Sequence, residues 1–232
     1  MTAPHVVDLA ASPVRALNAA LHALPRDTNI TRWRVQNPAG RHALAAGLDA
    51  PVTVEIDGHV GYYCAGMNKA ATVIVRGNAG TGVAENMMSG TVHVLGDASQ
   101  SAGATAHGGL LVIDGNAAAR CGISLKGADI VVKGSVGHMA AFMAQAGTLT
   151  VLGDAGDSLG DSIYEARLYV RGRVASLGAD CIETPMTDAD RAELQAKLLA
   201  AGLGGQVSAD AFRRYGSARR LYSFHVDNAA AY

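Results

Sequence analysis

The sequence predicts an all-β solenoid, a single-stranded parallel β-helix, and two observations carry this prediction. Glycine recurs at a strict interval of 19 residues through the middle of the 232-residue chain, at Gly58, Gly77, Gly96, Gly115, Gly134, Gly153 and Gly172. The positions four and two before each glycine are always apolar, which is the period of a strand with one buried face. A short repeat of constant length indicates units that bury their apolar faces by stacking on their neighbours.

The expected strand lies just before each glycine. Its inward-facing residues are Val54, Val73, Val92, Leu111, Ile130, Leu149 and Leu168 in one column, and Ile56, Val75, Val94, Ile113, Val132, Val151 and Val170 in the other. The residue between the two columns varies in character, so it is expected to point outward. This outward column is Glu55, Ile74, His93, Val112, Val131, Thr150 and Tyr169.

A turn and a second, shorter strand are expected after each glycine. The glycine is followed by a short polar residue in five coils, Asn78, Asp97, Asn116, Ser135 and Asp154, and such pairs are typical of turns because they tolerate positive φ. The next position is always Val or Ala, which predicts a second inward-facing strand. About seven coils stacked roughly 4.8 Å apart give a rod about 34 Å long.

Short helical caps are expected at both ends of the rod. Ser12 and Pro13 open a predicted helix with an apolar stripe at Val14, Leu17, Leu21 and Leu24. Residues 33–48 resemble a degenerate coil in the same phase, with Val35 nineteen residues before Val54. The predicted organisation is an N-terminal helix and capping coil over 1–50, the β-helix over 51–182, and C-terminal helices with an arm over 183–232.

The C-terminal region combines two predicted helices with an arginine- and tyrosine-rich arm. Thr187 with Asp190 indicates a capping box for a helix that runs to about Gly202, and Ser208 caps a second short helix. The arm supplies candidate partner-interface residues, Arg213, Arg214, Tyr215, Arg219, Arg220 and Tyr222. The alternative is that the arm docks on its own solenoid and caps its C-terminal end.

Composition narrows the class of protein. A formal net charge of −1 argues against nucleic acid as the main partner, and no apolar run is long enough to predict a membrane-spanning helix. Without a signal-peptide pattern, a cytoplasmic location is expected. Cys64 and Cys121 occupy the same column of the repeat, and this column is expected to face the interior. The two residues are three coils apart, which is too far for a disulfide. With Cys181, beyond the last predicted strand, they are expected to be buried structural thiols.

One column of the repeat could bind a ligand. Lys69, His107, Lys126 and Gln145 are expected to form a surface stripe, which could bind an anion or a carboxylate. The more common role of such a stripe is a solvated face or an interface with another chain. No nucleophile with its base and no metal-ligand spacing stands out, so the sequence predicts no catalytic residue, metal site or cofactor site in this chain.

Several stretches resemble a known family. The Gly-x-x-Gly spacing of the coils, as in Gly77 to Gly80 and Gly153 to Gly156, is similar to the C-terminal GXGXG β-helix domain of the glutamate synthase large subunit. The stretches GYYCAGMN at 61–68, VAENMMSG at 83–90 and YGSARRLY at 215–222 look most like the β-helix subunit of N-methylglutamate synthase. The resemblance covers roughly residues 30–232, and the coils at Ser99, Ala118 and Ala175 depart from the second glycine.

This resemblance implies a right-handed β-helix that serves as a scaffold subunit of a glutamate-synthase-like complex. An amidotransferase-like subunit and an FMN-binding synthase subunit with an iron–sulfur cluster would be its partners, within a higher hetero-oligomer. The implied reaction is a methylamine–glutamate N-methyltransferase reaction, in which methylamine and L-glutamate give N-methylglutamate and ammonia. The chain itself is expected to hold no cofactor.

Two alternatives stay open. The related β-helix subunit of formylmethanofuran dehydrogenase, or of a formyltransferase/hydrolase complex, has the same kind of solenoid. The chain could also be an autonomous enzyme with a groove site near His107.

Overall fold

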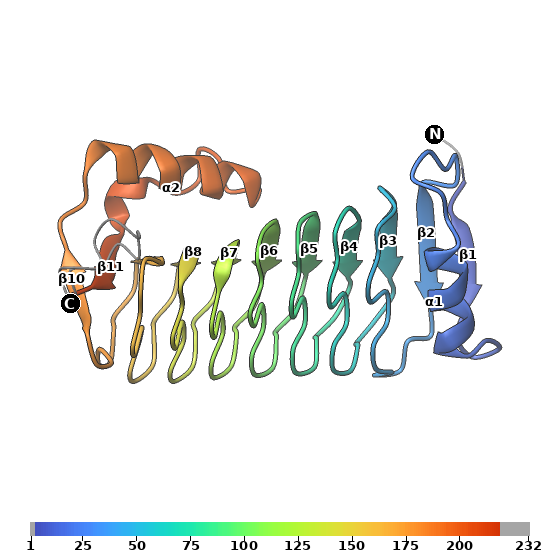
Figure 1. Ribbon diagram of the computed structural model, residues 1–232, viewed down its shortest axis with the longest axis horizontal. Coiled ribbons are helices and arrows are strands. Elements are labelled where there is room, and N and C mark those ends of the chain that lie inside the picture. The colour runs from blue at the N-terminus through green and yellow to red at the C-terminus, as the bar shows by residue number, and fades with distance from the viewer. Residues whose placement is uncertain (1–2, 219–232) are drawn as a thin grey trace, which may run out of the picture.

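The computed structural model describes residues 3–218, and they form a rod of stacked coils (Figure 1). Its strands make one eleven-stranded sheet in the order β1-β2-β3-β4-β5-β6-β7-β8-β9-β11-β10. The repeated strands are β3 (Thr53–Ile56), β4 (Thr72–Val75), β5 (Thr91–Val94), β6 (Leu110–Ile113), β7 (Lys126–Val132), β8 (Ala146–Val151) and β9 (Arg167–Val170). The prediction of a parallel β-solenoid of about seven turns is confirmed.

The register of the repeated strands follows the 19-residue spacing. Each of the strands β3 to β8 pairs in parallel with the next, so that Val54 lies opposite Val73 and Leu149 opposite Leu168. Both predicted inward columns have no exposed surface, which leaves the bore filled by branched aliphatic side chains. One copy of the repeat therefore makes one coil.

The second inward strand is shorter than predicted. It consists of one bridging pair per coil, such as Val60 with Ala79 and Ala155 with Val174. Farther along each coil, Cys64 and Cys121 lie in the core as predicted, with free thiols. Burial raises the pKa of each of these two thiols to about 12, so both stay protonated and unreactive.

The repeating glycines are required by the close approach of successive coils. A Cβ atom on Gly77 would lie 2.7 Å from the carbonyl carbon of Gly58, and one on Gly115 would lie 2.9 Å from that of Gly96. In this series only Gly58 has positive φ. The expectation that these turns need positive φ is therefore wrong for most coils, and the spacing between backbones is the physical reason for glycine.

The short polar residues after the glycines form a ladder along one corner of the rod. The side-chain oxygen of Asn78 accepts a hydrogen bond from the backbone nitrogen of Asp97 at 3.0 Å, and Asp97 accepts one from Asn116 at 2.7 Å. The pattern continues to Ser135, Asp154 and Arg173. Each residue in this column thus satisfies a backbone donor of the next coil.

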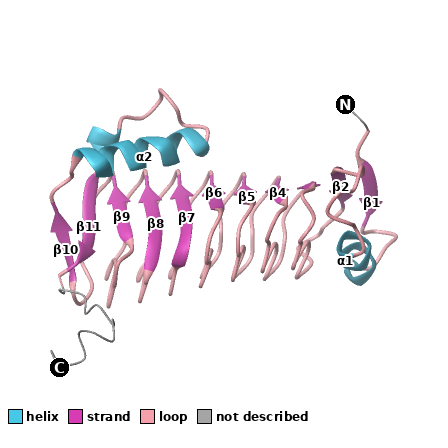
Figure 2. Ribbon diagram, turned by 45° about the horizontal axis from the view of Figure 1, so that its top comes forward, coloured by secondary structure: helices cyan, strands magenta, loops and turns pink. Residues whose placement is uncertain are grey.

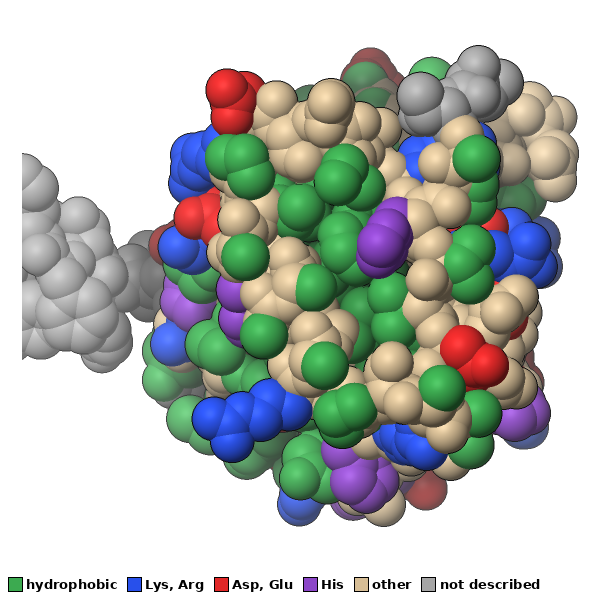
Figure 3. All heavy atoms as spheres, turned by 90° about the vertical axis from the view of Figure 1, so that its right-hand side faces the viewer, with side chains coloured by type: hydrophobic (Ala, Val, Ile, Leu, Met, Phe, Trp, Pro, Cys, Tyr) green, Lys and Arg blue, Asp and Glu red, His purple; other side chains and the backbone are tan. Residues whose placement is uncertain are grey.

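The N-terminal cap consists of β1 (His5–Asp8), α1 (Val14–His22) and β2 (Arg32–Gln36). Leu17 and Leu21 of α1 pack on the core as predicted, but Pro13 takes the capping position and no side chain caps this helix. Val35 pairs with Ile56, so the predicted pairing with Val54 is wrong, because the first coil holds two extra residues. β1 was not predicted. Figure 3 shows hydrophobic side chains over much of this end.

The C-terminal cap reverses the direction of the chain. β11 (Arg213–Ser217) lies between β9 and β10 (Cys181–Thr184) and is antiparallel to both. Cys181 opens β10, whereas it was expected beyond the last strand. Between these strands come α2 (Asp188–Ala200), with the predicted Thr187–Asp190 capping box, and the 3₁₀-helix η1 (Ala209–Ala211), capped by Ser208 as predicted.

Helix α2 covers the outward face of the last strands (Figures 1 and 2). Its Leu194 and Leu198 pack with Val112, Val131 and Tyr169 of the outward column in a second core. The same column is partly exposed at Glu55, Ile74 and His93 in β3 to β5. Outward residues therefore point away from the bore in all coils, but those of β6 to β9 are buried beneath a helix.

The strand phase can be tested with one substitution at two neighbouring residues of β4. Val75→Asn buries an amide in the apolar bore, where Val75 is fully buried, and should lower the free energy of unfolding by about 2–4 kcal/mol. Ile74→Asn, at an outward and partly exposed position, should cost less than about 1 kcal/mol. Urea unfolding measures both, and equal losses would contradict the phase.

The role of the glycine column can be tested in the same way. Gly77→Ala forces a methyl group against the preceding coil and should destabilise the protein by about 1–3 kcal/mol. Gly216→Ala is the control, because a Cβ atom there would meet no atom within 4 Å. If both variants unfold at the same urea concentration as the wild type, then the close approach of coils does not explain the column.

Candidate functional site

The predicted surface stripe lies along one corner of the rod. Lys69, His107, Lys126 and Gln145 are exposed and occupy the same position in their coils. The backbone nitrogen of His107 donates to Met87 at 2.7 Å, and that of Lys126 donates to Ala106 at 2.8 Å, so the hydrogen bonds between coils fix their spacing. Lys69 lies 3.7 Å from Asp49. The stripe is thus an ordered row with cationic side chains at Lys69 and Lys126.

The described part of the arm contacts its own solenoid. Tyr215 is 2% exposed and belongs to the main core. Arg214 donates to the hydroxyl of Thr184 at 2.7 Å and lies 3.0 Å from Asp190. Arg213 donates to the carbonyl of Gly172 at 2.9 Å. For these three residues the placement favours docking on the chain's own sheet, whereas Arg219, Arg220 and Tyr222 lie outside the described residues.

A polar network fastens α2 to the solenoid. The hydroxyl of Tyr169 lies 3.1 Å from Glu193 and 3.3 Å from Asp190. Arg167 forms an ion pair with Glu193 at 2.7 Å. Burial and the neighbouring carboxylate of Glu193 raise the pKa of Tyr169, so its hydroxyl stays protonated and donates. Sequence reasoning missed this network, although the change to apolar residues at Val112 and Val131 signals that something covers the sheet.

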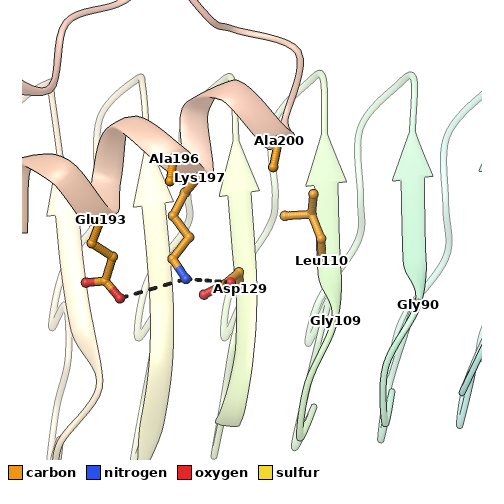
Figure 4. A pocket seen from close by; sticks show the side chains of 8 residues that line it. All are labelled: Gly90, Gly109, Leu110, Asp129, Glu193, Ala196, Lys197 and Ala200. Carbon is orange, nitrogen blue, oxygen red and sulfur yellow. Dashed lines mark hydrogen bonds and ion pairs between the residues drawn. The ribbon is translucent and has the colours of Figure 1, made fainter.

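The network continues into a cleft at the end of α2 (Figure 4). This cleft, of about 410 Å³, is lined by Gly90, Gly109, Leu110, Asp129, Glu193, Ala196, Lys197 and Ala200. The Lys197 ammonium donates to Asp129 at 2.6 Å and lies 3.8 Å from Glu193, and Thr148 donates to Asp129 at 2.7 Å. Lys197 pairs with both carboxylates of the cleft, and Arg167 pairs with Glu193 as well, so this arrangement is suited to holding α2 in place.

Residues 3–218 contain neither a cluster of metal-binding side chains nor a membrane-spanning helix. No three His, Cys, Asp or Glu side chains there lie close enough together to hold a metal ion. No helix in this range combines the length and the apolarity needed to cross a membrane.

The capping network makes the C-terminal cap sensitive to acid. Burial raises the pKa of Asp190, but hydrogen bonds from Thr187 and the positive charge of Arg214 outweigh it, so the pKa of Asp190 is lowered from its usual 3.8. Because the pKa of Asp190 is lower in the folded state than in the unfolded chain, its ionised carboxylate stabilises the fold at pH values above the pKa of the unfolded chain. This stabilisation disappears as the pH falls through the pKa of the folded state.

We therefore expect Asp190→Asn to cost about 1–3 kcal/mol at neutral pH, because it removes a charged partner of Thr187 and Arg214. The difference from the wild type should shrink below about pH 4. Denaturant unfolding as a function of pH measures it. Asp188→Asn is the control, since its side chain is fully exposed. A difference that is constant with pH would contradict the role of the charge.

Comparison with known proteins identifies the family. No protein-family model matches the chain. A chain of the formyltransferase/hydrolase complex FhcABCD from Methylorubrum extorquens, solved in complex with methylofuran, matches with a TM-score of 0.56, 21% identity, and coverage of 90% of this chain and 88% of that one. At this identity the likeness shows a shared fold. Protein GlxC of Rhizobium meliloti (strain 1021) is 60% identical over 227 residues, 98% of this chain and 99% of the relative, and so this chain belongs to the GlxC family.

Proposed function

We propose that this chain is the non-catalytic scaffold subunit of a glutamate-synthase-like complex, N-methylglutamate synthase. In this complex it would hold an amidotransferase-like subunit and an FMN-binding synthase subunit, with its iron–sulfur cluster, in register. The reaction would join methylamine to L-glutamate and release ammonia. The contribution of this chain is the distance and the orientation between its partners.

The common 19-residue register of β3 to β9 is the observation that carries the proposal, and its one shift lies where β7 and β8 begin, between Lys126 and Asp129. Seven strands in a constant 19-residue register span about 29 Å at the strand spacing. Backbone hydrogen bonds join the coils on both flanks, as from Gly80 to Val60 at 2.9 Å and from Leu95 to Val75 at 2.9 Å. Such a ladder resists bending, and cooperating active sites gain rate when their geometry is held fixed.

The way charged side chains are used also supports a structural role. In the cleft and beneath α2, Lys197, Arg167 and Arg214 each pair with a carboxylate of the same chain. The three thiols are buried and free. The charged side chains in the cleft and beneath α2, and the buried thiols, therefore have structural roles in the fold.

A second candidate is the corresponding subunit of a formyltransferase/hydrolase-type complex. The fold shared with a chain of FhcABCD favours this candidate, because that complex also contains a solenoid of this kind. Both candidates assign a scaffold role to the chain, and they differ in the chemistry of its partners.

Purification of the tagged full-length chain from its native host separates these candidates. We expect an amidotransferase-like chain and a flavoprotein to co-purify, with a flavin absorbance spectrum and formation of N-methylglutamate from methylamine and glutamate. Mass spectrometry identifies the chains. Partners of the formyltransferase type would favour the second candidate. Turnover by the isolated chain, lost in His107→Ala, would show an autonomous enzyme and contradict both.

A further inference from the structure

Two histidine rings near the N-terminal end of the rod accept hydrogen bonds from the backbone. The Nδ1 atom of His59 accepts one from the backbone nitrogen of Asn78 at 2.9 Å. The Nδ1 atom of His42 accepts one from the backbone nitrogen of Tyr62 at 3.2 Å. A backbone N–H can only donate, so Nδ1 must carry a lone pair in both rings, and both rings must be neutral. We call these two rings and the two amides that they bind the histidine corner.

His59 is the first member of the ladder that runs along one corner of the rod. In the next five coils the same position is occupied by residues that accept with a side-chain oxygen, Asn78, Asp97, Asn116, Ser135 and Asp154. An amide, hydroxyl or carboxylate oxygen accepts a hydrogen bond in neutral and in weakly acidic solution. A histidine accepts one at Nδ1 only while it is neutral. From residue 59 to residue 154 of this ladder, His59 is therefore the member whose acceptor is lost between about pH 5 and 8.

The ring of His42 has a fixed place beside the amide that it binds. It stacks on the ring of Tyr62, with the ring centroids 4.1 Å apart and an angle of 28° between the planes. Its Nδ1 atom also lies so close to Gly61 that a Cβ atom there would clash with it. The backbone nitrogen of Gly61 donates to the carbonyl of Arg41 at 2.8 Å, which holds the two turns together.

Protons reach both rings without any opening of the core, because His42 and His59 are exposed. The other charged or titratable side chains of this corner, in the turns 37–42, 57–62, 76–81 and 95–100, are Arg41, Asp57, Tyr62, Arg76 and Asp97. From β1, Asp8 reaches the corner through a hydrogen bond from Asn37 at 2.7 Å.

The charged groups of the corner have other partners. Asp57 pairs with Arg34 at 2.6 Å, and Arg76 pairs with Glu55 at 2.7 Å. Arg41 donates to the carbonyl of Leu9. Within residues 3–218, no carboxylate forms an ion pair with the ring of His42 or His59. A proton gained by either ring is therefore not balanced by a paired negative charge.

Two other histidines make contacts of the opposite kind. The Nε2 atom of His22 donates to the carbonyl of Ala46 at 2.7 Å, and the Nε2 atom of His93 donates to Asp114 at 2.8 Å. A protonated ring keeps the N–H group that these contacts need. Weak acid therefore removes the hydrogen bonds of His42 and His59 and leaves those of His22 and His93 in place.

We infer that the histidine corner is a pH-sensitive switch between the first coils of the rod. A second proton on either ring places an N–H group opposite a backbone N–H group, which breaks the hydrogen bond and leaves the amide of Tyr62 or Asn78 to water. The two bonds are present where the rings are neutral and are lost as the pH falls through the range in which histidine gains its proton. The coils after Asn78 keep their oxygen acceptors, so the loosening is confined to the N-terminal end. This inference goes beyond the proposed function and does not depend on which chains are the partners.

Amide hydrogen exchange of the full-length chain, followed by NMR at about pH 7.5 and about pH 5, tests this inference. The protection of an amide is its intrinsic exchange rate at each pH divided by the observed rate. In the wild type, the protection of the Asn78 and Tyr62 amides should fall about fivefold between the two pH values, because each loses one hydrogen bond. The amide of Asn116, whose acceptor is Asp97, should change less than about twofold.

Two substitutions separate the switch from a general effect of acid. His59→Asn supplies the acceptor that later coils use, so the Asn78 amide should keep its protection at about pH 5. The Tyr62 amide, still bound to His42, should lose protection as in the wild type. His138→Asn is the matched control, because His138 is exposed and its ring has no partner within residues 3–218. This control should leave both losses unchanged.

Thermal unfolding gives a second readout. Between the same two pH values, the melting temperature of the wild type should fall about 2 °C more than that of His59→Asn. Equal protection of the wild-type Asn78 amide at both pH values would overturn the inference. The same loss of protection in His59→Asn as in the wild type would overturn it as well. Because the test uses this chain alone, neither result changes the standing of the proposed function.

Discussion

The constant length of the coil is the constraint on which the rest of the molecule depends. Side chains alternate between bore and surface along each strand, so a single extra residue in one coil would turn its inward column outward. With 19 residues in every repeat, Val73, Val92 and their equivalents stack directly, and the corner residues from Asn78 to Asp154 meet the backbone of the next coil. The packing of the bore and the hydrogen bonds at the corner therefore both depend on the constant 19-residue length of the coil.

The two flanks of the rod have different surroundings although they share one backbone repeat. On the strand side, α2 covers Val112, Val131 and Tyr169 and is fixed by ion pairs that join it to β7 and β9. The segments by which the coils return to the next strand are also joined by backbone hydrogen bonds, but they expose methionines and tyrosines, Tyr62, Met67, Met88, Met143 and Tyr164. A stiff body with chemically distinct sides can position more than one neighbour at once.

The repeat itself could be predicted from sequence because periodicity records the contacts between coils. The strand phase, the interior position of Cys64 and the Thr187–Asp190 capping box were all predicted correctly. The pairing of the caps with the repeated strands could not be predicted, because each cap occurs once. The extra residues near Val35 leave no periodic trace, and β11 pairs with β9 across a long sequence separation. The network of Tyr169, Asp190 and Glu193 likewise depends on where α2 lies, which no local pattern specifies.

The irregular ends of the rod have a consequence for its solubility. A stack of identical coils is open to growth, since each terminal edge could template another molecule and lengthen into a fibre. At one end the longer first turn breaks the periodicity, and at the other β11 runs against the direction of all the strands before it. The strands at the two edges of the sheet, β1 and β10, lie outside the 19-residue repeat, so an incoming copy in the common phase would meet no strand of the repeat at either end. The irregular strands at the two ends of the sheet therefore oppose the stacking of molecules into filaments.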